Sequence, residues 1–435
     1  MSCDFDTVLN RQGTSCLKYD FEKQRTGRTD LLPMWVADMD FRAPDCVLDA
    51  LKRRTEHGIF GYTDPDDSYF DAMENWFLTR YGLSIQREWN TVTPGVVYAI
   101  ACAVRAFTKP GEKVLIQEPV YYPFRETIEL NGRVCVSSSL IRSDSEGLHY
   151  EMRFDDLAQK LADPDVHLML LCSPHNPVGR VWSADELRKV SSLCRENGVV
   201  LLSDEIHCDF ILPGHHFTSV LALGGAETSN AVVCTSASKS FNLSGLQVAN
   251  ILVPDSKLRK AFRHENAASG YSQGNAAGLT ATEAAWRGGA PWLDSLLQYL
   301  NGNLEFVRSY LRENLPGIRL VEPEGTYLLL LDFSGICKTY EELHDLVQNK
   351  AKLWFDEGRI FGPETALFER INIACPRCVL KKALGQLKDA VQDTCTPGSQ
   401  SFNNQKCLRE WPKFNSSNNQ KCLQERPKGE SDNER

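Results

Sequence analysis

The chain has no long hydrophobic run. No segment of its 435 residues reaches the roughly 18 consecutive apolar residues that a membrane-spanning helix requires. The first twenty residues contain Asp4, Asp6, Arg11 and Lys18 without an apolar core, so we expect no secretory signal peptide there. These absences predict a protein that does not associate with membranes, and they make the cytoplasm the expected compartment.

The sequence also lacks an excess of positive charge. Its formal net charge is −9, with 42% hydrophobic and 24% charged residues, a composition that is ordinary for a soluble enzyme. A chain of this balance has no basic footprint for nucleic acid, and we expect no nucleic-acid partner. Its length exceeds what one hydrophobic core usually organises, so two or more domains are predicted.

Cysteines at metal-ligand spacing are missing as well. The 15 cysteines are scattered, and several, such as Cys102, Cys172 and Cys234, lie inside apolar runs, so we interpret them as reduced thiols. The one C-x-x-C, from Cys375 to Cys378, contains a proline and an arginine and has no second pair at zinc spacing. No metal site is predicted.

Apolar runs of strand length recur in the first two thirds of the chain. They occupy residues 114–117, 168–172, 199–203, 231–236 and 248–253. Helix-like segments lie between several of them, and the one at 183–198 begins with Ser183 followed by Glu186, the pattern of a capping box. Strands that alternate with helices predict an α/β fold with a mostly parallel sheet, whose ligands bind beyond the carboxyl ends of the strands.

The remaining sequence divides into a further α/β region and a polar tail. Between 276 and 393 a long helix, strands around TYLLLLDF and ERINIA, and a last amphipathic helix predict a smaller domain. From 394 to 435 the composition is polar, and NNQKCLREWPK recurs as NNQKCLQERPK. Such a repeat buries too little apolar surface to fold, which predicts a disordered tail. A short docking motif around Leu408 and Trp411 is the alternative interpretation of this tail.

A lysine among small hydroxylic residues follows one of the buried strands. Lys239 lies in TSASKSFNLSGLQ, and lysine is rarely buried without a function. Desolvation lowers the pKa of a lysine in such a pocket, and the neutral amine can form a Schiff base with an aldehyde. Taken alone, the segment also fits a surface turn with a solvated lysine.

Polar groups at three other predicted element boundaries suit one bound ligand. Asp204 ends an apolar run in LLSDEIH, where a buried carboxylate needs a cation such as a protonated pyridine nitrogen. Asn176 lies in the turn SPHNPVG, where its amide is placed to donate to a phenolate oxygen. The segment TPGVV opens a helix-like stretch, and free N–H groups at a helix start bind phosphate. Each signal is weak alone, and their combination is specific.

Together these motifs resemble the fold-type-I pyridoxal-phosphate enzymes of the class I and II aminotransferase group, over roughly residues 1–392. Four longer motifs are similar to those of the MalY/PatB-type cystathionine β-lyases: MWVADMDF (34–41), FGYT (60–63), SKSFNLSGLQ (238–247) and ERINIACPR (369–377). The resemblance implies pyridoxal 5'-phosphate as cofactor and a fold-type-I architecture. Its expected parts are an N-terminal arm (1–45) that contributes to the small domain, a large cofactor-binding domain (46–275) with a mostly parallel central sheet, and a small α/β domain (276–393).

The resemblance also implies roles for individual residues. Lys239 would be the catalytic Schiff-base lysine, Asp204 would keep the pyridine nitrogen protonated, and Arg370 would pair with the substrate carboxylate. The other implied cofactor contacts are Asn176 and His207 at the phenolic oxygen, Tyr121 stacked on the ring, Gly95, Val96, Ser236 and Ser238 at the phosphate, and Tyr62, which would reach the phosphate of the partner subunit in a homodimer. Tyr122 is an alternative to Tyr121, Arg377 is an alternative to Arg370, and His207 also fits as a core histidine.

The expected function is that of a carbon–sulfur β-lyase, which cleaves L-cystathionine or related cysteine S-conjugates to a thiol, pyruvate and ammonia. An aminotransferase shares the early chemistry, so only the resemblance separates the two. Gln247 stands where many aminotransferases carry a basic phosphate ligand, which favours the lyase. Glu364 and Thr365 stand in a loop that is often glycine-rich in relatives, which leaves the shape of the substrate pocket open.

A regulatory or binding protein on the same fold is an alternative of another class. The intact set of Lys239, Asp204, Asn176 and Arg370 argues against it, because a binding module needs no Schiff-base lysine opposite a carboxylate. The preferred thioether and the role of the tail do not follow from the sequence.

Overall fold

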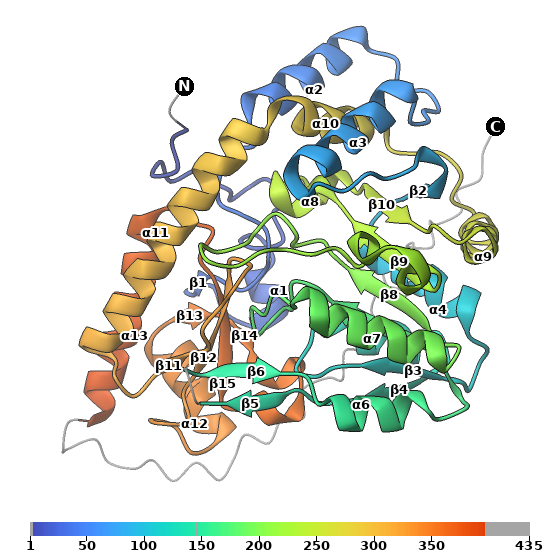
Figure 1. Cartoon of the computed structure of the whole chain (residues 1–435). Helices are drawn as coiled ribbons and strands as arrows, with labels where there is room; N and C mark the ends of the chain where they lie inside the picture. The colour runs from blue at the N-terminus through green and yellow to red at the C-terminus, as the bar shows by residue number, and fades with distance from the viewer. Residues whose placement is uncertain (1–2, 145–146, 396–435) are drawn as a thin grey trace, which may run out of the picture. The chain divides into compact units, whose positions relative to one another are not determined.

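The larger sheet of the protein has seven strands. The computed structural model describes residues 3–144 and 147–395, and in it the sheet has the order β2-β10-β9-β8-β7-β3-β4 (Figure 1). Neighbouring strands are parallel except that β10 is antiparallel to both β2 and β9, so the mostly parallel sheet is confirmed. In sheet order the strands span Asn90–Thr93, Ala249–Leu252, Ala231–Thr235, Val200–Asp204, Val166–Cys172, Lys113–Ile116 and Val134–Ser137.

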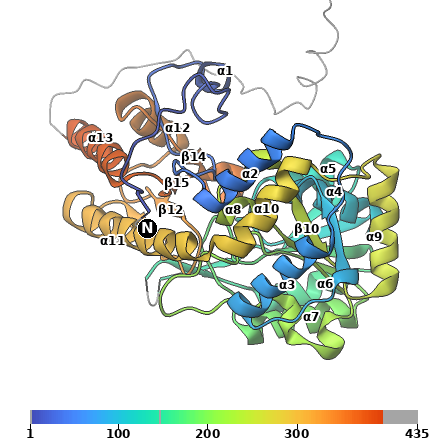
Figure 2. The same ribbon diagram turned by 90° about the horizontal axis from the view of Figure 1, so that it is seen from above.

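Continuous apolar runs form these strands because helices cover both faces of the sheet. Along β7, Leu168 and Leu170 belong to one core cluster, while Met169 and Leu171 belong to the other. The first cluster packs under α4 (Val96–Phe107), α5 (Pro123–Leu130) and α9 (Ser256–Ala268), which lie together in Figure 2. The second packs under helices that include α3 (Asp67–Tyr81), α7 (Ala184–Glu196), α10 (Ala276–Gly288) and α11 (Ala290–Asn314).

The predicted helix after β7 is present and begins as expected. In α7 the Ser183 side chain accepts from the N–H of Glu186, whose side chain accepts from the N–H of Ser183, so the capping box is complete. This arrangement satisfies backbone donors that the first turn of a helix leaves free. It fixes the start of the element that connects β7 to β8, the strand that ends at Asp204.

A second, antiparallel sheet of four strands has the order β11-β12-β15-β14. Its strands span Arg319–Leu320, Leu328–Asp332, Phe368–Asn372 and Asp356–Glu357. Both strands predicted here, β12 and β15, are confirmed, as is the final helix α13 (Arg377–Cys395). Figure 1 shows α11 and α13 side by side along this sheet, and one core cluster runs from here to the larger sheet.

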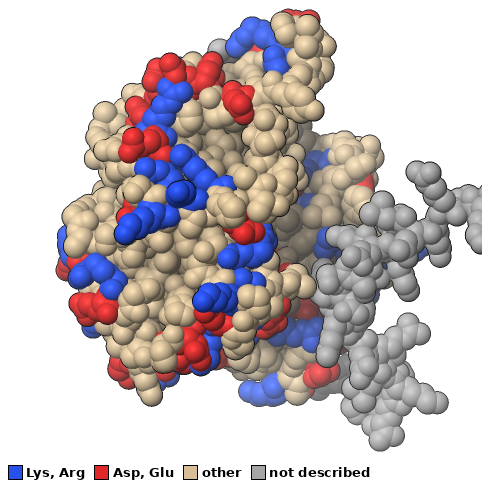
Figure 3. Space-filling view, turned by 90° about the vertical axis from the view of Figure 1, so that its right-hand side faces the viewer, with Lys and Arg blue, Asp and Glu red and all other residues tan. Residues whose placement is uncertain are grey.

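Smaller elements complete the fold. They are α1 (Glu22–Thr26), β1 (Leu32–Pro33), α2 (Asp45–His57), β5 (Ile141–Ser143), β6 (His149–Glu151), α6 (Phe154–Leu161), α8 (Ala237–Ser240), α12 (Tyr340–His344) and β13 (Leu353–Trp354). Basic and acidic side chains both occur over the face shown in Figure 3, among many uncharged residues. No helix among the described residues is long and apolar enough to cross a membrane.

The predicted domain boundaries at 45/46 and 275/276 stay predictions. The helix α13 continues to Cys395, and the rest of the predicted tail lies outside the described residues.

Candidate active site

Lys239 lies just beyond the carboxyl end of β9, in the one-turn helix α8. Its Nζ atom donates a hydrogen bond to the backbone carbonyl of Ala37 at 3.1 Å. Desolvation lowers the pKa of Lys239 to about 8; Arg370 adds to this effect, whereas Asp38 and Asp204 oppose it. A lysine in this state releases its proton close to neutral pH, so its neutral amine is accessible for chemistry.

Asp204 is the last residue of β8 and is 3% exposed. Its Oδ1 atom accepts a hydrogen bond from the N–H of Ile206 at 3.2 Å, and it has no ion-pair partner among the described residues. Burial raises the pKa of Asp204 to about 7, and the charge of Lys239 opposes this rise. A buried carboxylate in this position lacks the cation that would make its charge favourable. A ligand that carries a positive charge would supply one.

Asn176 and His207 follow the ends of β7 and β8. The Oδ1 atom of Asn176 accepts a hydrogen bond from Arg370 at 2.9 Å, which leaves the amide nitrogen as a donor. Burial, together with the charges of Lys239 and Arg370, lowers the pKa of His207 to about 3, so this imidazole is neutral. Its Nδ1 atom is buried and has no hydrogen-bond partner among the described residues. A buried ring nitrogen without a partner is more typical of a ligand-binding site than of a histidine in a packed core.

The residues predicted at the phosphate follow two strands that run in the same direction. Both β2 and β9 are antiparallel to β10, which lies between them, so their carboxyl ends lie at one edge of the sheet. Gly95 is the N-cap of α4 and Val96 is its first residue. On the other strand, the Ser236 hydroxyl accepts from the N–H of Ser238 at 3.0 Å. The sheet thus brings a helix N-terminus and two serines to the same edge, which suits an anion.

Arg370 lies on β15 and is 3% exposed. Its guanidinium donates to Asn176 and to the carbonyl of Trp35 at 3.2 Å, and it forms an ion pair with Asp356. It lies over the ring of Phe361, 4.8 Å from the ring centroid. Its Nε–H is buried without an acceptor among the described residues. The bond to Asn176 brings the smaller sheet into contact with the loop after β7.

The alternatives to two predicted residues differ from them in position. Arg377 bonds to Asn303 on α11 at 2.6 Å, away from Lys239, whereas Arg370 lies within electrostatic range of that lysine. Tyr121 and Tyr122 are both half-buried, and the charge of Asp204 is among the main influences on Tyr121, whereas those on Tyr122 are Asp356, Glu126, Arg370 and Arg25. Burial raises the pKa of both phenols. This geometry favours Arg370 and Tyr121 as the residues next to the predicted cofactor.

A model of the family described as "Aminotransferase class I and II" matches residues 29–387. This chain belongs to that family. It is 42% identical to cystathionine beta-lyase PatB of Bacillus subtilis, over 89% of this chain and 100% of that protein, and 34% identical to protein MalY of Escherichia coli, over 89% and 99%. Among solved structures it is similar to cystalysin from Treponema denticola, which contains pyridoxal 5'-phosphate, with a TM-score of 0.87 and 34% identity over 91% of this chain and 100% of that one.

In this member of the class I and II aminotransferase family, Tyr62 differs from the other predicted site residues because it lies on the surface. Its side chain is 96% exposed, and the neighbouring Ile59 and Phe60 are 67% and 63% exposed. A surface hollow is lined by Phe60, Gly61 and Tyr62 and by residues 270–277. The structure of one chain therefore places Tyr62 on an apolar outer surface.

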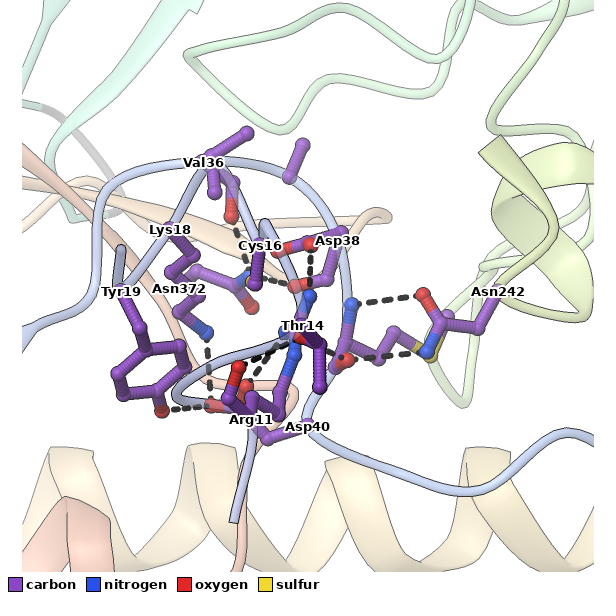
Figure 4. A network of polar contacts seen from close by, with 12 residues as sticks. Arg11, Thr14, Cys16, Lys18, Tyr19, Val36, Asp38, Asp40, Asn242 and Asn372 are labelled. Carbon is purple, nitrogen blue, oxygen red and sulfur yellow. Dashed lines mark hydrogen bonds and ion pairs between the residues drawn. The ribbon is translucent and has the colours of Figure 1, made fainter. Parts of the chain in front are cut away.

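The segment from Trp35 to Phe41 carries most of one predicted motif and is held from several sides (Figure 4). The Asn242 side chain donates to the carbonyls of Met39 and Phe41 at 2.9 and 3.0 Å. The Asp40 carboxylate pairs with Arg11 and Lys18, both at 2.7 Å. The same segment supplies the Ala37 carbonyl that bonds to Lys239. The motif thus fixes a backbone acceptor against the lysine.

Three residues near the site were missed by the sequence analysis. The charge of Asp38 opposes the lowering of the Lys239 pKa, the Tyr327 hydroxyl donates to the Ala37 carbonyl at 2.8 Å, and Asp356 pairs with Arg370. A signal existed for Asp356, because it follows the apolar stretch LWF as Asp204 follows LLS. Asp38 and Tyr327 reach the site only through the tertiary fold.

Gln247, Glu364 and Thr365, the residues that depart from the family pattern, are all described in the structure. Gln247 has a left-handed backbone with φ +51° and an exposed side chain. Glu364 is exposed, whereas Thr365 is fully buried and its hydroxyl donates to the carbonyls of Gly358 and Gly362 at 2.8 and 3.0 Å. Thr365 therefore braces the loop before β15 from the inside.

Proposed function

We propose that the protein is a pyridoxal-phosphate-dependent carbon–sulfur β-lyase that cleaves L-cystathionine or related cysteine S-conjugates to a thiol, pyruvate and ammonia. The observation that carries the cofactor chemistry is the pair of Lys239, whose pKa is lowered to about 8, and Asp204, a buried carboxylate with no cationic partner among the described residues. The similarity to cystathionine beta-lyase PatB, over 89% of this chain and all of that protein, directs this chemistry towards carbon–sulfur cleavage.

The residues of the site fit pyridoxal phosphate. Asp204 has no ion-pair partner among the residues that the structure describes, and a protonated ring nitrogen would provide one. The unpaired Nδ1 atom of His207 and the free amide nitrogen of Asn176 suit the phenolic oxygen. The α4 N-terminus with Gly95 and Val96 suits the phosphate, and Ser236 and Ser238 add to this side. Tyr121 is assigned to the face of the ring.

Among the side chains of the site, Arg370 binds the substrate and Lys239 transfers the proton. When bound, the cofactor withdraws electrons from the substrate Cα, which makes its proton acidic. The Lys239 amine, oriented by the Ala37 carbonyl, takes this proton as general base. Arg370 holds the α-carboxylate with a planar, always charged donor. The Cβ–S bond breaks with its electron pair on sulfur, which leaves as a thiolate, a stable anion, and one water then converts the remaining three-carbon product to pyruvate and ammonia.

The test separates the lyase from an aminotransferase. The purified protein is mixed with L-cystathionine in the absence of any 2-oxo acid, and pyruvate and free thiol are measured. Equal amounts of both products support the lyase. If pyruvate and thiol do not form, and amino-group transfer begins only after a 2-oxo acid is added, the protein is an aminotransferase.

We also infer a homodimer in which Tyr62 reaches the cofactor phosphate of the partner subunit. The exposed apolar group of Ile59, Phe60 and Tyr62 supports this assembly, because a contiguous exposed apolar patch marks an interaction surface. A gel-filtration mass of twice 48.9 kDa is expected for the purified protein.

Tyr62→Phe should weaken pyridoxal phosphate binding about 10- to 100-fold without dissociating the dimer. The ring that covers the interface remains, while one hydrogen bond to a charged phosphate is lost, which typically costs about 1.5 to 3 kcal/mol. Equilibrium titration of the apoprotein with the cofactor measures this change. Tyr310→Phe, on α11, is the matched control. Unchanged cofactor affinity in a dimeric Tyr62→Phe protein would show that Tyr62 does not bind the phosphate.

A further inference from the structure

A buried carboxylate stands next to the arginine assigned to the substrate. Asp356 on β14 is paired in register with Arg370 on β15, and their side chains form an ion pair in which both residues are nearly inaccessible, at 8% and 3% exposure. Burial raises the pKa of the Asp356 carboxyl, and the guanidinium of Arg370 opposes this rise. The permanently charged guanidinium thus favours the carboxylate form of Asp356.

Asp356 is the acid of this strand pair that faces the site. Its neighbour Glu357 is paired with Glu369, and because side chains alternate along a strand, both lie on the opposite face of the sheet. There Glu357 accepts from Tyr340 at 2.7 Å and from Arg359 at 2.8 Å. The two adjacent carboxylates on β14 therefore lie on opposite faces of the sheet and have different partners.

The charge of Asp356 also reaches the aromatic side of the site. It is the largest electrostatic influence on Tyr122 and also acts on Tyr121. The exposed Arg25 is a further cation that influences Asp356. Asp356 therefore contacts the arginine assigned to the α-carboxylate and acts by its charge on both tyrosines at the predicted cofactor.

We propose that Asp356 is a specificity-determining residue that makes the substrate site reject amino acids whose side chain carries a net negative charge. This inference rests on the proposed function. Asp356 already offsets the single positive charge of Arg370, so the site has little charge left for a second carboxylate. That carboxylate would also be repelled by Asp356 in a partly desolvated pocket, where charges interact more strongly than in water.

The substrate class follows from this balance of charge. Cysteine thioethers with neutral S-substituents are accepted, as are those whose distal end is zwitterionic, because its net charge is zero. Cationic substituents gain from Asp356, whereas dicarboxylic amino acids and thioethers with an anionic substituent are disfavoured.

Three thioethers of similar length test this selectivity on the holoenzyme: S-propyl-, S-(2-aminoethyl)- and S-carboxymethyl-L-cysteine. For each, kcat/KM of Asp356→Asn is divided by that of the wild type, which removes differences in leaving-group chemistry. We expect this ratio to be about tenfold higher for the anionic thioether than for the neutral one, and lower for the cationic one. Glu357→Gln, which removes the neighbouring charge from the opposite face, should give three equal ratios. Three equal ratios for Asp356→Asn would show that Asp356 only positions Arg370 and would overturn the proposal.

Binding measurements keep this inference separate from the lyase activity and from the stability of the variant. By calorimetry, the wild-type holoenzyme should bind L-aspartate about tenfold more weakly than L-2-aminobutyrate, and L-2,3-diaminopropionate more tightly than L-aspartate. These amino acids report on charge even if no thioether is cleaved, in which case only the lyase assignment fails. Equal affinity of the wild type for L-aspartate and L-2-aminobutyrate would contradict the role of Asp356 without any variant.

Discussion

Lys239→Ala should lose carbon–sulfur lyase activity by roughly a thousandfold or more while the protein stays folded. The substitution removes both the amine that attaches the cofactor and the base assigned to the Cα proton, and base catalysis alone typically contributes about 10² to 10⁴. The fold should survive, because it costs free energy to desolvate this amine, as its lowered pKa of about 8 indicates. Pyruvate release from L-cystathionine measures the activity, and thermal unfolding measures the stability.

The control for this variant is Lys260→Ala, which removes an exposed lysine on α9. It should keep the wild-type rate and the visible absorption band of the bound cofactor. Lys239→Ala should bind the cofactor reversibly, so that gel filtration removes it. If Lys239→Ala keeps more than about a tenth of the wild-type rate, another residue is the base, and the assignment of Lys239 is wrong.

The larger sheet could be predicted from the sequence because its strands are buried on both faces. Runs such as 168–172 and 231–234 are apolar throughout, as expected for strands of a sheet that helices cover on both sides. The shortest strands gave no such signal. β14 contains only Asp356 and Glu357, and its pairing with β15 depends on tertiary packing rather than on any local pattern.

In the candidate site, too, the features that depend on local sequence could be predicted and those that depend on tertiary contacts could not. Asp204 ends one buried strand and Lys239 lies four residues beyond another, so their positions near strand ends could be predicted from the sequence, although their catalytic roles stay predictions. Contacts between distant segments could not be read. The Ala37 carbonyl accepts from Lys239 across 202 residues, and the position of Asp356 after the apolar stretch LWF does not reveal that it pairs with Arg370.

Asp204→Asn should make the apoprotein more stable and the enzyme much less active. The pKa of Asp204 is raised from 3.8 to about 7 in the folded chain, so the folded state binds this proton more tightly than the unfolded state does. Stability therefore falls as pH rises from about 4 to about 7, and the full cost is present above pH 7. Asparagine keeps the shape without the charge, so the variant apoprotein should gain about 2 to 4 kcal/mol at pH 8 and nothing at pH 3.5. Denaturant unfolding of both apoproteins at the two pH values measures this difference.

The same substitution should lower kcat about 100- to 1000-fold, because a neutral amide cannot hold a proton on the ring nitrogen of the cofactor. Glu205→Gln is the matched control, since Glu205 is also buried and its pKa is also raised to about 7, but it bonds to Ser203 and Val220. It should change stability over the same pH range and leave kcat near the wild-type value. If both variants lose activity equally, the loss arises from disturbed packing after β8. If Asp204→Asn alone becomes inactive while its apoprotein gains stability, the buried carboxylate of Asp204 destabilises the apoprotein but is required for activity with the cofactor.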